Sequence, residues 1–302
     1  ICRHFDFMSS MAVDGIVNYG IGDWCAPFDG PAISVNMSTF KAPVALTDTA
    51  CYYRSARMLS KMSRVLGLDD PYLARSEEIR AALLRNFVDA DTGEVAGACQ
   101  TSDGCVAFHH LLKPQEEARL MERLAERIAQ NGWHIDYGIL GSKYVLNMLG
   151  EYGRTDVIYK MLTREDYPGY LYWVDHGCTT LAECWNLGGS HNHYMFSDVS
   201  AVFYRYFAGI RPDGDIPAYR SFLLAPALDL AIDTLSCSVE SPHGTIFAGW
   251  KKDGDTVTFT AGVPFGTTAR LRLPAGVQAP ENGAVLDGGR HEFCWKIAQS
   301  AG

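Results

Sequence analysis

The sequence predicts a mainly helical domain followed by a smaller β domain. Residues 40–209 place apolar side chains at helical spacing between short polar turns. From Leu235 onward, short runs alternate between apolar and polar residues and are separated by glycine- and proline-containing turns. The change follows the segment "GIRPDGD" at residues 209–215. We therefore expect one domain over residues 1–211 and a second over residues 212–302, a division that 302 residues can support.

The helical part begins with a helix that should end at Gly67, a residue suited to a C-terminal stop. The spacing places apolar and basic residues on different faces of this helix. The apolar face contains Met58, Met62, Val65 and Leu66, and the basic face contains Arg54, Arg57, Lys61 and Arg64. Further helices are expected after Pro71 and Pro114 and in "SKYVLNMLG" and "TDVIYKML", with Ser197 capping a last one. Paired helices of this length indicate a helical barrel or bundle.

The C-terminal part contains the runs "LSCSVES", "GTIFAGWKK", "TVTFTAGV" and "TTARLRLP". Asp253-Gly254, between two of these runs, is a strong hairpin signal. The spacing of runs and turns predicts an antiparallel β-sandwich.

Charge and composition exclude some classes of partner. The net charge is −9, from 26 basic and 35 acidic residues, and this argues against nucleic acid or an anionic membrane. Aromatic residues make up 12% of the chain, which suits a neutral sugar. No apolar stretch approaches the length of a transmembrane helix.

The nine cysteines are scattered, with no C-x-x-C pair and no zinc-site spacing. We expect them to be mostly reduced, buried and structural, which favours a cytoplasmic location. No cofactor and no metal are expected.

The stretch "YGIGDWCAPFDG" is the first candidate for a binding loop. Asp23 and Trp24 are neighbours in a non-helical segment, so one side chain can face a pocket while the other packs. Asp23 could hydrogen-bond a polyol while Trp24 offers a flat face to its C–H groups. The alternative is a structural turn with a core tryptophan.

The stretch "QNGWHIDYGILGSKY" places His134 and Asp136 just before a helix. Polar groups there are available to a ligand and equally available as helix caps. His134 is a candidate ligand contact, whereas Asp136 is a natural N-cap.

The stretch "TTLAECWNLGGSHNHYMF" combines Glu183 and Trp185 with a Gly-Gly pair and two histidines. A carboxylate near an apolar tryptophan and imidazole donors can act as a general acid or base. In the alternative, Thr180 caps a short helix and Glu183 completes its capping box. His191 and His193 could bind a metal, but no third ligand has suitable spacing.

Taken in order, these stretches resemble the bacterial α-L-rhamnosidases of glycoside hydrolase family 78. The matching segments are "YGIGDW", "TACYYRSARMLSKMSRVLG", "HIDYGILGSKYVLNML", "GCTTLAECW", "NHYMF" and "VSAVFYRYFAGIRP". The later "GTIFAGWKKDGDTVTFTAGVPFGTTARLRLP" is similar to the β-sandwich that closes those enzymes. The resemblance implies an (α/α)6 barrel followed by a β-sandwich.

It also implies inverting hydrolysis of terminal α-L-rhamnose from a rhamnose-containing glycoside. In such a reaction one carboxylic acid protonates the leaving oxygen and an opposite carboxylate activates water. The family's general base maps onto Glu183 and its sugar-contacting histidine onto His193. Asp23 and Trp24 match a pocket-lining loop, and Trp185 would form part of the pocket wall.

The family's acidic motif around the general acid, ahead of the "GDW" loop, has no counterpart here. We therefore expect the barrel to be incomplete at its N-terminus, the acid to lie upstream, and the chain alone to be inactive. Three other functions stay open: another (α/α)6 glycosidase acting on a glucosyl or fucosyl residue, a sugar epimerase using the histidine pair, and a non-catalytic carbohydrate-binding remnant.

Overall fold

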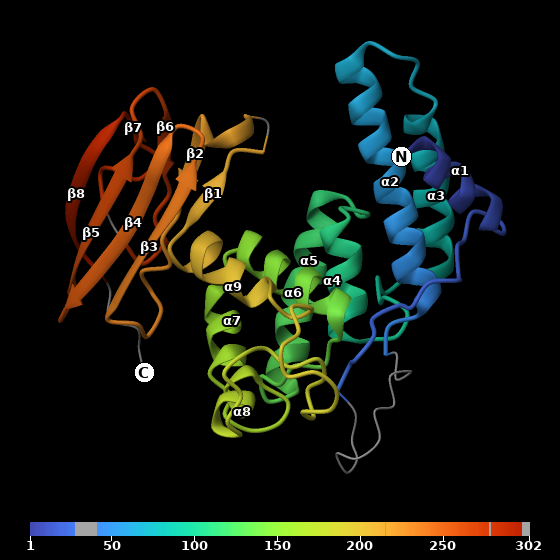
Figure 1. Cartoon of the computed structure of the whole chain (residues 1–302), viewed down its shortest axis with the longest axis horizontal. Coiled ribbons are helices and arrows are strands. Elements are labelled where there is room, and N and C mark those ends of the chain that lie inside the picture. Colours follow the sequence, from blue (N-terminus) through green and yellow to red (C-terminus); the bar gives the residue numbers. More distant parts are fainter. Residues whose placement is uncertain (28–40, 215, 278, 298–302) are drawn as a thin grey trace. The chain divides into compact units, whose positions relative to one another are not determined.

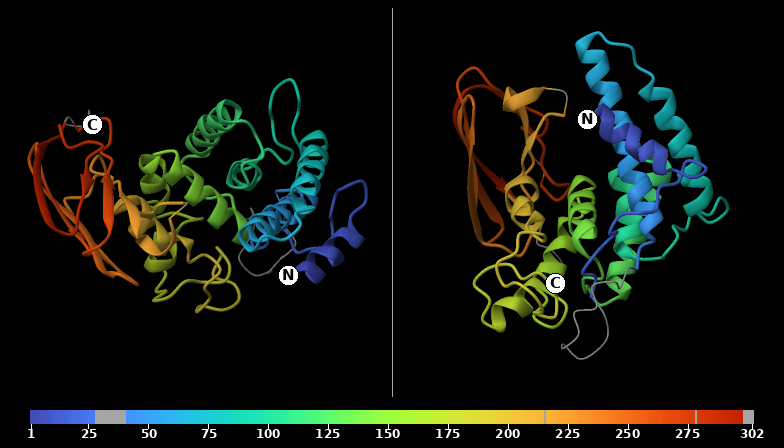
Figure 2. Two further views of the ribbon diagram at one scale, coloured as in Figure 1. Left: turned by 90° about the horizontal axis from the view of Figure 1, so that it is seen from above. Right: turned by 45° about the vertical axis from the view of Figure 1, so that its right-hand side comes forward.

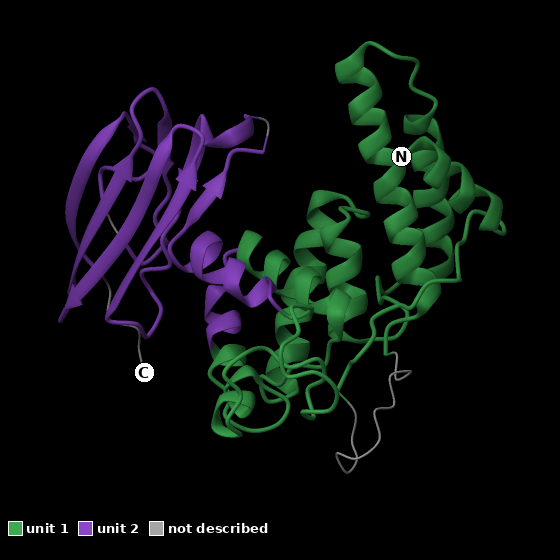
Figure 3. Cartoon of the chain, viewed as in Figure 1, with its two compact units in different colours: residues 1–152, 160–196 green, residues 153–159, 197–302 purple. Residues whose placement is uncertain are grey.

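The computed structural model describes residues 1–27, 41–214, 216–277 and 279–297. These residues form two compact units (Figure 3). The first unit comprises residues 1–152 and 160–196, and the second comprises residues 153–159 and 197–302.

The first unit is built from helices. They are α1 (Cys2–Met11), α2 (Val44–Leu66), α3 (Tyr72–Phe87), α4 (Gln100–Phe108), α5 (Pro114–Gln130), α6 (Ile139–Glu151) and α8 (Tyr170–Asp175); α7 (Thr155–Leu162) begins in the second unit and ends in the first. Helices α2 and α3 form one hairpin, α4 pairs with α5, and α4 also packs closely against α6 (Figure 1). No helix among the described residues is long and apolar enough to cross a membrane.

Helix α2 ends where the sequence predicts. Gly67 has φ 64°, and its N–H donates to the carbonyl oxygens of Ser63 and Arg64. The apolar face suggested by spacing is nevertheless exposed, at Met58, Met62, Val65 and Leu66. The buried stripe instead contains Ala50, Tyr53, Ala56, Leu59, Ser60 and Ser63. The small residues in this stripe allow α2 to pack closely against its neighbours. A pattern of hydrophobic side chains alone does not identify such a face.

Helix α4 lies at the centre of the first unit, and every residue from Gln100 to Ala107 is buried. Two glycines explain its close contact with α6. A Cβ at Gly104 would lie 3.0 Å from the Val145 side chain, and one at Gly141 would lie 2.1 Å from Thr101 Oγ1. The N-terminal ends of α4 and α6 are therefore held side by side, and the candidate site residues gather around them.

The second unit contains two four-stranded sheets (Figure 2). One has the order β1 (Ile210–Pro212), β2 (Ser221–Leu224), β6 (Thr268–Leu271), β7 (Val285–Leu286); the other has the order β3 (Thr234–Ser241), β4 (Gly244–Asp253), β5 (Thr256–Val263), β8 (Gly289–Lys296). The unit also includes α9 (Asp198–Val202), a π-helical turn (Phe203–Phe207) and a 3₁₀ turn (Pro217–Tyr219).

The predicted antiparallel pairing is confirmed throughout the β3-β4-β5-β8 sheet and for the pairs β1-β2 and β6-β7 of the other sheet. The pair β2-β6 departs from it, because these two strands are parallel. The hairpin predicted at Asp253-Gly254 joins β4 to β5, with Asp253 opposite Thr256. Trp250, Phe259 and Trp295 are buried on this sheet.

All nine cysteines are free thiols. Cys25, Cys99, Cys105 and Cys184 are buried, whereas Cys2, Cys51 and Cys294 are exposed. The expectation of mostly buried cysteines is therefore wrong, since some thiols lie on helix and strand faces turned to solvent.

Candidate functional site

Asp23 is fully buried, and its carboxylate holds the start of α6. Oδ2 accepts hydrogen bonds from the Gly138 N–H at 2.8 Å and the Thr101 hydroxyl at 2.5 Å. Oδ1 accepts from the N–H groups of Leu140 and Gly141, both at 2.9 Å. Burial raises the pKa of this carboxyl above its usual range, although all four hydrogen bonds oppose that shift.

This geometry makes Asp23 the cap of α6, and a sugar contact by its carboxylate would have to displace one of these hydrogen-bond partners. The side chain is 0% exposed, so no surface is left for a ligand hydroxyl. Asp136, the expected N-cap of α6, instead accepts the Gln100 N–H of α4 at 3.1 Å. The N-cap position of α6 is Gly138, which has no side chain to cap with. Asp23 supplies the missing acceptor from a distant loop.

Trp24 is half-buried beside this cap. Its carbonyl oxygen accepts the Ile139 N–H at 2.9 Å. A Cβ at Gly138 would lie 2.2 Å from that oxygen, so glycine is required for the loop to approach the helix. The backbone of Trp24 is therefore held in place, while the residue stays partly exposed.

Glu183 lies in an irregular loop and not in the short helix considered from the sequence. Its Oε2 accepts the Ser190 N–H at 2.8 Å, and its own N–H donates to the Ser190 carbonyl oxygen at 2.8 Å. The His193 N–H donates to the Leu181 carbonyl oxygen at 2.9 Å, which extends this pairing of two chain segments. Glu183 Oε1 has no hydrogen-bond partner among the residues that the structure describes. The capping box with Thr180 does not form, because Thr180 Oγ1 donates to the His191 carbonyl oxygen instead.

Gly189 allows this loop to close against the carboxylate. Its φ is 75°, and a Cβ there would lie 2.5 Å from Glu183 Oε2. Any larger residue would be strained and would push the carboxylate away. The Gly-Gly pair in the sequence already indicated a loop that can approach closely. The hydrogen bond from the Ser190 N–H is made by the backbone, so no residue type predicts it.

Trp185, the predicted wall of the sugar pocket, follows in the chain and packs into the core. The side chain is 1% exposed, and its indole N–H donates to the Tyr137 carbonyl oxygen at 2.9 Å. It stacks on Trp173 with centroids 4.5 Å apart and an interplanar angle of 16°. Tyr137, Tyr170 and Phe196 complete this aromatic cluster. The cluster supports the loop from beneath.

His134 lies ahead of α6, as predicted, and both ring nitrogens are engaged. Nδ1 lies 2.8 Å from the Asn131 carbonyl oxygen, and Nε2 lies 3.0 Å from Asp166 Oδ2. Arg164 also bonds the same carboxylate. Hydrogen bonds from Arg164 and then His134 lower the pKa of Asp166 to about 2. A ligand contact by His134 would have to displace one of these partners.

His193 and its neighbour form the outer part of the Glu183 loop. The His193 ring is half-buried and accepts the Met195 N–H at Nδ1, 3.3 Å away. The Tyr194 ring stacks beside it at 5.7 Å and is 81% exposed. His191, two residues earlier, uses Nε2 on the Leu187 carbonyl oxygen at 2.8 Å. Tyr194 is an accessible aromatic group that the motif analysis did not single out.

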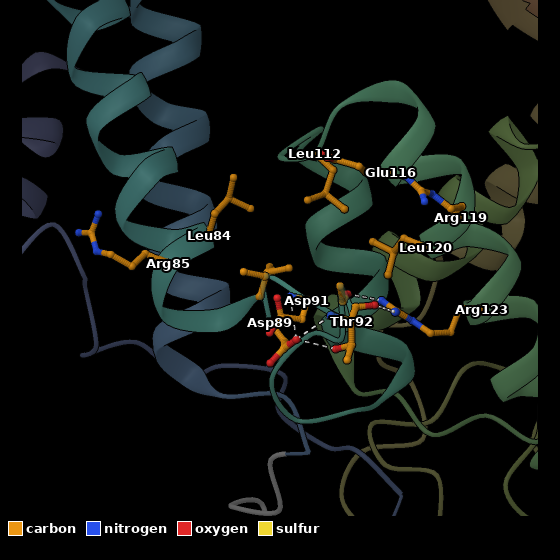
Figure 4. A pocket seen from close by; sticks show the side chains of 13 residues that line it. Leu84, Arg85, Asp89, Asp91, Thr92, Leu112, Glu116, Arg119, Leu120 and Arg123 are labelled. Atoms are coloured by element: carbon orange, nitrogen blue, oxygen red, sulfur yellow. Dashed lines mark hydrogen bonds between the residues drawn. The ribbon is translucent and has the colours of Figure 1, made fainter.

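A cavity of about 740 Å³ opens elsewhere in the first unit, between the end of α3, the turn at residues 88–93, and α5 (Figure 4). Arg123 fixes that turn by donating to the carbonyl oxygens of Thr92 and Gly93. None of the six predicted site residues lines this cavity. It is therefore separate from the candidate site around Glu183.

Residues 1–207 match the bacterial α-L-rhamnosidase six-hairpin glycosidase domain. Residues 209–284 match the bacterial α-L-rhamnosidase C-terminal domain. The chain belongs to the bacterial α-L-rhamnosidase family. The expectation drawn from the ordered motifs is thereby confirmed.

Curated α-L-rhamnosidases have similar sequences. An α-L-rhamnosidase of Streptomyces avermitilis is 30% identical over 268 residues, which cover 85% of this chain and 25% of that protein. An α-L-rhamnosidase of an Alteromonas species is 26% identical over 272 residues, which cover 84% of this chain and 29% of that protein. The chain thus spans between a quarter and a third of the length of these relatives.

Solved α-L-rhamnosidases have the same fold. The S. avermitilis enzyme in complex with L-rhamnose superposes with a TM-score of 0.83 and 26% identity, over 96% of this chain and 29% of that one. The enzyme from Dictyoglumus thermophilum gives a TM-score of 0.83 at 24% identity, over 98% of this chain and 36% of that one.

Proposed function

We propose that the chain is part of an inverting α-L-rhamnosidase and that Glu183 is its general base. The observation that carries this proposal is the asymmetry of the Glu183 carboxylate. One oxygen is fixed by the Ser190 N–H, while Oε1 has no partner among the described residues and the side chain is partly accessible. A base that must hold and deprotonate a water needs this combination of fixed orientation and a free acceptor.

An inverting mechanism also needs a general acid on the opposite side of the sugar, about 6.5–9.5 Å from the base. Asp23 is unsuited, because its carboxylate is 0% exposed and occupied by α6. We place the acid outside these 302 residues. The helical hairpins would then be part of an (α/α)6 barrel, and the C-terminal sheets a β-sandwich, with the boundary between residues 211 and 212.

The sugar would be a terminal α-L-rhamnose. Trp24 and His193, one on each of the two loops, are both partly exposed. An indole face suits the apolar C5 methyl group of this deoxy sugar, and an imidazole suits a hydroxyl. The rhamnose complex of the S. avermitilis relative supports this substrate class.

The test is release of p-nitrophenol from its α-L-rhamnoside, by the chain and by a longer natural polypeptide that contains it. We expect activity only in the longer form. In that form Glu183→Gln should reduce kcat by several orders of magnitude and leave rhamnose binding largely intact. Glu292→Gln, on the exposed side of β8, is the matched control and should keep full activity.

A loss of only a few-fold in Glu183→Gln would rule out the base role. Activity of the short chain would show that one of its own acids donates the proton. Rhamnose binding by the longer form without any cleavage of rhamnosides would favour a carbohydrate-binding function, and cleavage of other aryl glycosides would change the substrate.

A further inference from the structure

Two buried thiols meet where the Asp23 loop touches the Glu183 loop. Cys25 Sγ lies 3.3 Å from Cys184 Sγ, although the two residues are 159 positions apart in the sequence. The side chains are 5% and 7% exposed. Cys25 follows the residues that cap α6, and Cys184 directly follows Glu183.

Neither cysteine belongs to a regular helix or strand. Cys25 has φ 60°, an uncommon backbone conformation for a residue with a side chain. Two sulfurs in contact need to approach by only about 1.3 Å to reach the length of a disulfide bond, near 2.05 Å. Loop segments can make such a movement more easily than residues inside a packed helix.

The pair is also chemically asymmetric. The hydrogen bond between the thiols lowers the pKa of Cys184 and, together with burial, raises the pKa of Cys25 well above its usual range. A lower thiol pKa favours Cys184 as the attacking sulfur, with Cys25 as the second thiol of the pair.

We propose that Cys25 and Cys184 form a dithiol site that reacts with a small hydroperoxide and closes to a disulfide. Cys184 sulfur attacks one peroxide oxygen, the O–O bond breaks, and the other oxygen leaves as water, so that Cys184 becomes a sulfenic acid. Cys25 sulfur then attacks Cys184 sulfur, and the S–O bond breaks to release a second water. In total, two thiols and one hydrogen peroxide give one disulfide and two waters.

A hydroperoxide is the fitting oxidant because little of either thiol is accessible, so a bulky disulfide reagent would be slow. The product would tie the loop of Glu183 to the loop that caps α6. A bond between residues so far apart restricts the unfolded chain, and we expect the melting temperature to rise by about 4–10 °C. This site does not depend on Glu183 being the base.

The experiment treats the reduced protein with hydrogen peroxide, blocks remaining thiols with iodoacetamide, and maps the peptides by mass spectrometry. We expect a linked Cys25–Cys184 peptide, a raised melting temperature, and reversal of both by dithiothreitol. Cys184→Ser and Cys25→Ser should lose the link and the thermal shift. Cys178→Ser, six residues before Cys184, is the control and should behave as the wild type.

The proposal is overturned if peroxide oxidises the exposed Cys2, Cys51 and Cys294 while Cys25 and Cys184 remain alkylatable thiols. It is equally overturned if Cys184 is oxidised to sulfinic acid without forming the link. Both results come from the wild-type protein, so they do not depend on whether a serine variant folds.

Discussion

The carboxylate of Asp23 caps α6 from another part of the chain, 118 residues before Gly141. It accepts the N–H groups of Gly138, Leu140 and Gly141, which are groups that a helix leaves unpaired at its start. The negative charge also faces the positive end of the helix dipole. A loop and a helix that the sequence separates are thereby joined at the candidate site.

Replacing Asp23 with Asn should destabilise the first unit by about 2–4 kcal/mol, because an amide offers one acceptor and turns its NH2 group toward N–H donors. Urea unfolding measures the loss, and amide exchange should quicken first at Leu140 and Gly141. Asp91→Asn, in an exposed turn, is the control. Equal stability of Asp23→Asn and the wild type would refute the capping role.

Gly189→Ala tests how the Glu183 loop is held. The new Cβ would collide with Glu183 Oε2, so we expect kcat in the active polypeptide to fall about 10–100-fold, as misplacement of a catalytic group by about 1 Å does. Gly177→Ala is a matched control, since φ is 84° there and nothing lies within 4 Å of the added Cβ. If both variants lose activity equally, backbone strain and not displacement of the carboxylate explains the effect.

Local sequence patterns predicted features whose causes are local. Gly67 ends α2 and Asp253-Gly254 begins a hairpin, because both depend on backbone conformations that glycine favours. Clustered glycine, aromatic and acidic residues also predicted an irregular loop at Asp23, and the segment at Glu183 is irregular too.

Features that depend on distant partners could not be found in this way. Asp23 looks like a ligand group until the start of α6 is seen to need its carboxylate. The three-residue spacing of Thr180 and Glu183 suggested a capping box, yet Ser190 provides the partner across a turn. The alternating run "TTARLRLP" predicts the strand β6, but alternation does not show that this strand pairs parallel to β2.

Trp185→Phe and Trp24→Phe should separate a core tryptophan from a pocket tryptophan. Trp185→Phe loses a stacked ring and the hydrogen bond to the Tyr137 carbonyl oxygen, so we expect a stability loss of about 2–3 kcal/mol with KM unchanged. Trp24→Phe should cost less stability and raise KM for the aryl rhamnoside. Calorimetric melting and steady-state kinetics on both variants provide the comparison. A raised KM in Trp185→Phe alone would reverse the assignment.

Asp103 on α4 should make stability fall as the pH rises from about 4 to 6. Its side chain is 0% exposed, and burial raises its pKa to about 6 despite the Arg127 Nε only 3.0 Å away. The folded state therefore holds a proton that the unfolded state has already lost, and this advantage disappears above pH 6. Between pH 4 and pH 7, the free energy of unfolding of Asp103→Asn should rise by up to about 3 kcal/mol relative to that of the wild type. A difference in unfolding free energy that stays constant over this range would show that Arg127 keeps Asp103 ionised.

His109, at the end of α4, should act in the opposite direction. The ring is 5% exposed and neither nitrogen has a hydrogen-bond partner among the described residues. Burial, with Arg54 nearby, lowers its pKa to about 3. Below about pH 6.5 the His109 imidazole is therefore protonated in the unfolded chain but not in the folded chain. The free energy of unfolding falls as the pH drops below that value.

Relative to His109→Leu, the wild type should lose about 3 kcal/mol of unfolding free energy between pH 7 and pH 4. His4→Leu, at an exposed position on α1, is the control substitution. Because Asp103 and His109 oppose each other below pH 6, the wild-type curve alone would hide both contributions, and each must be measured as a difference between matched variants. Parallel curves for wild type and His109→Leu would mean that the imidazole is protonated in the folded protein, with an anionic partner beside it.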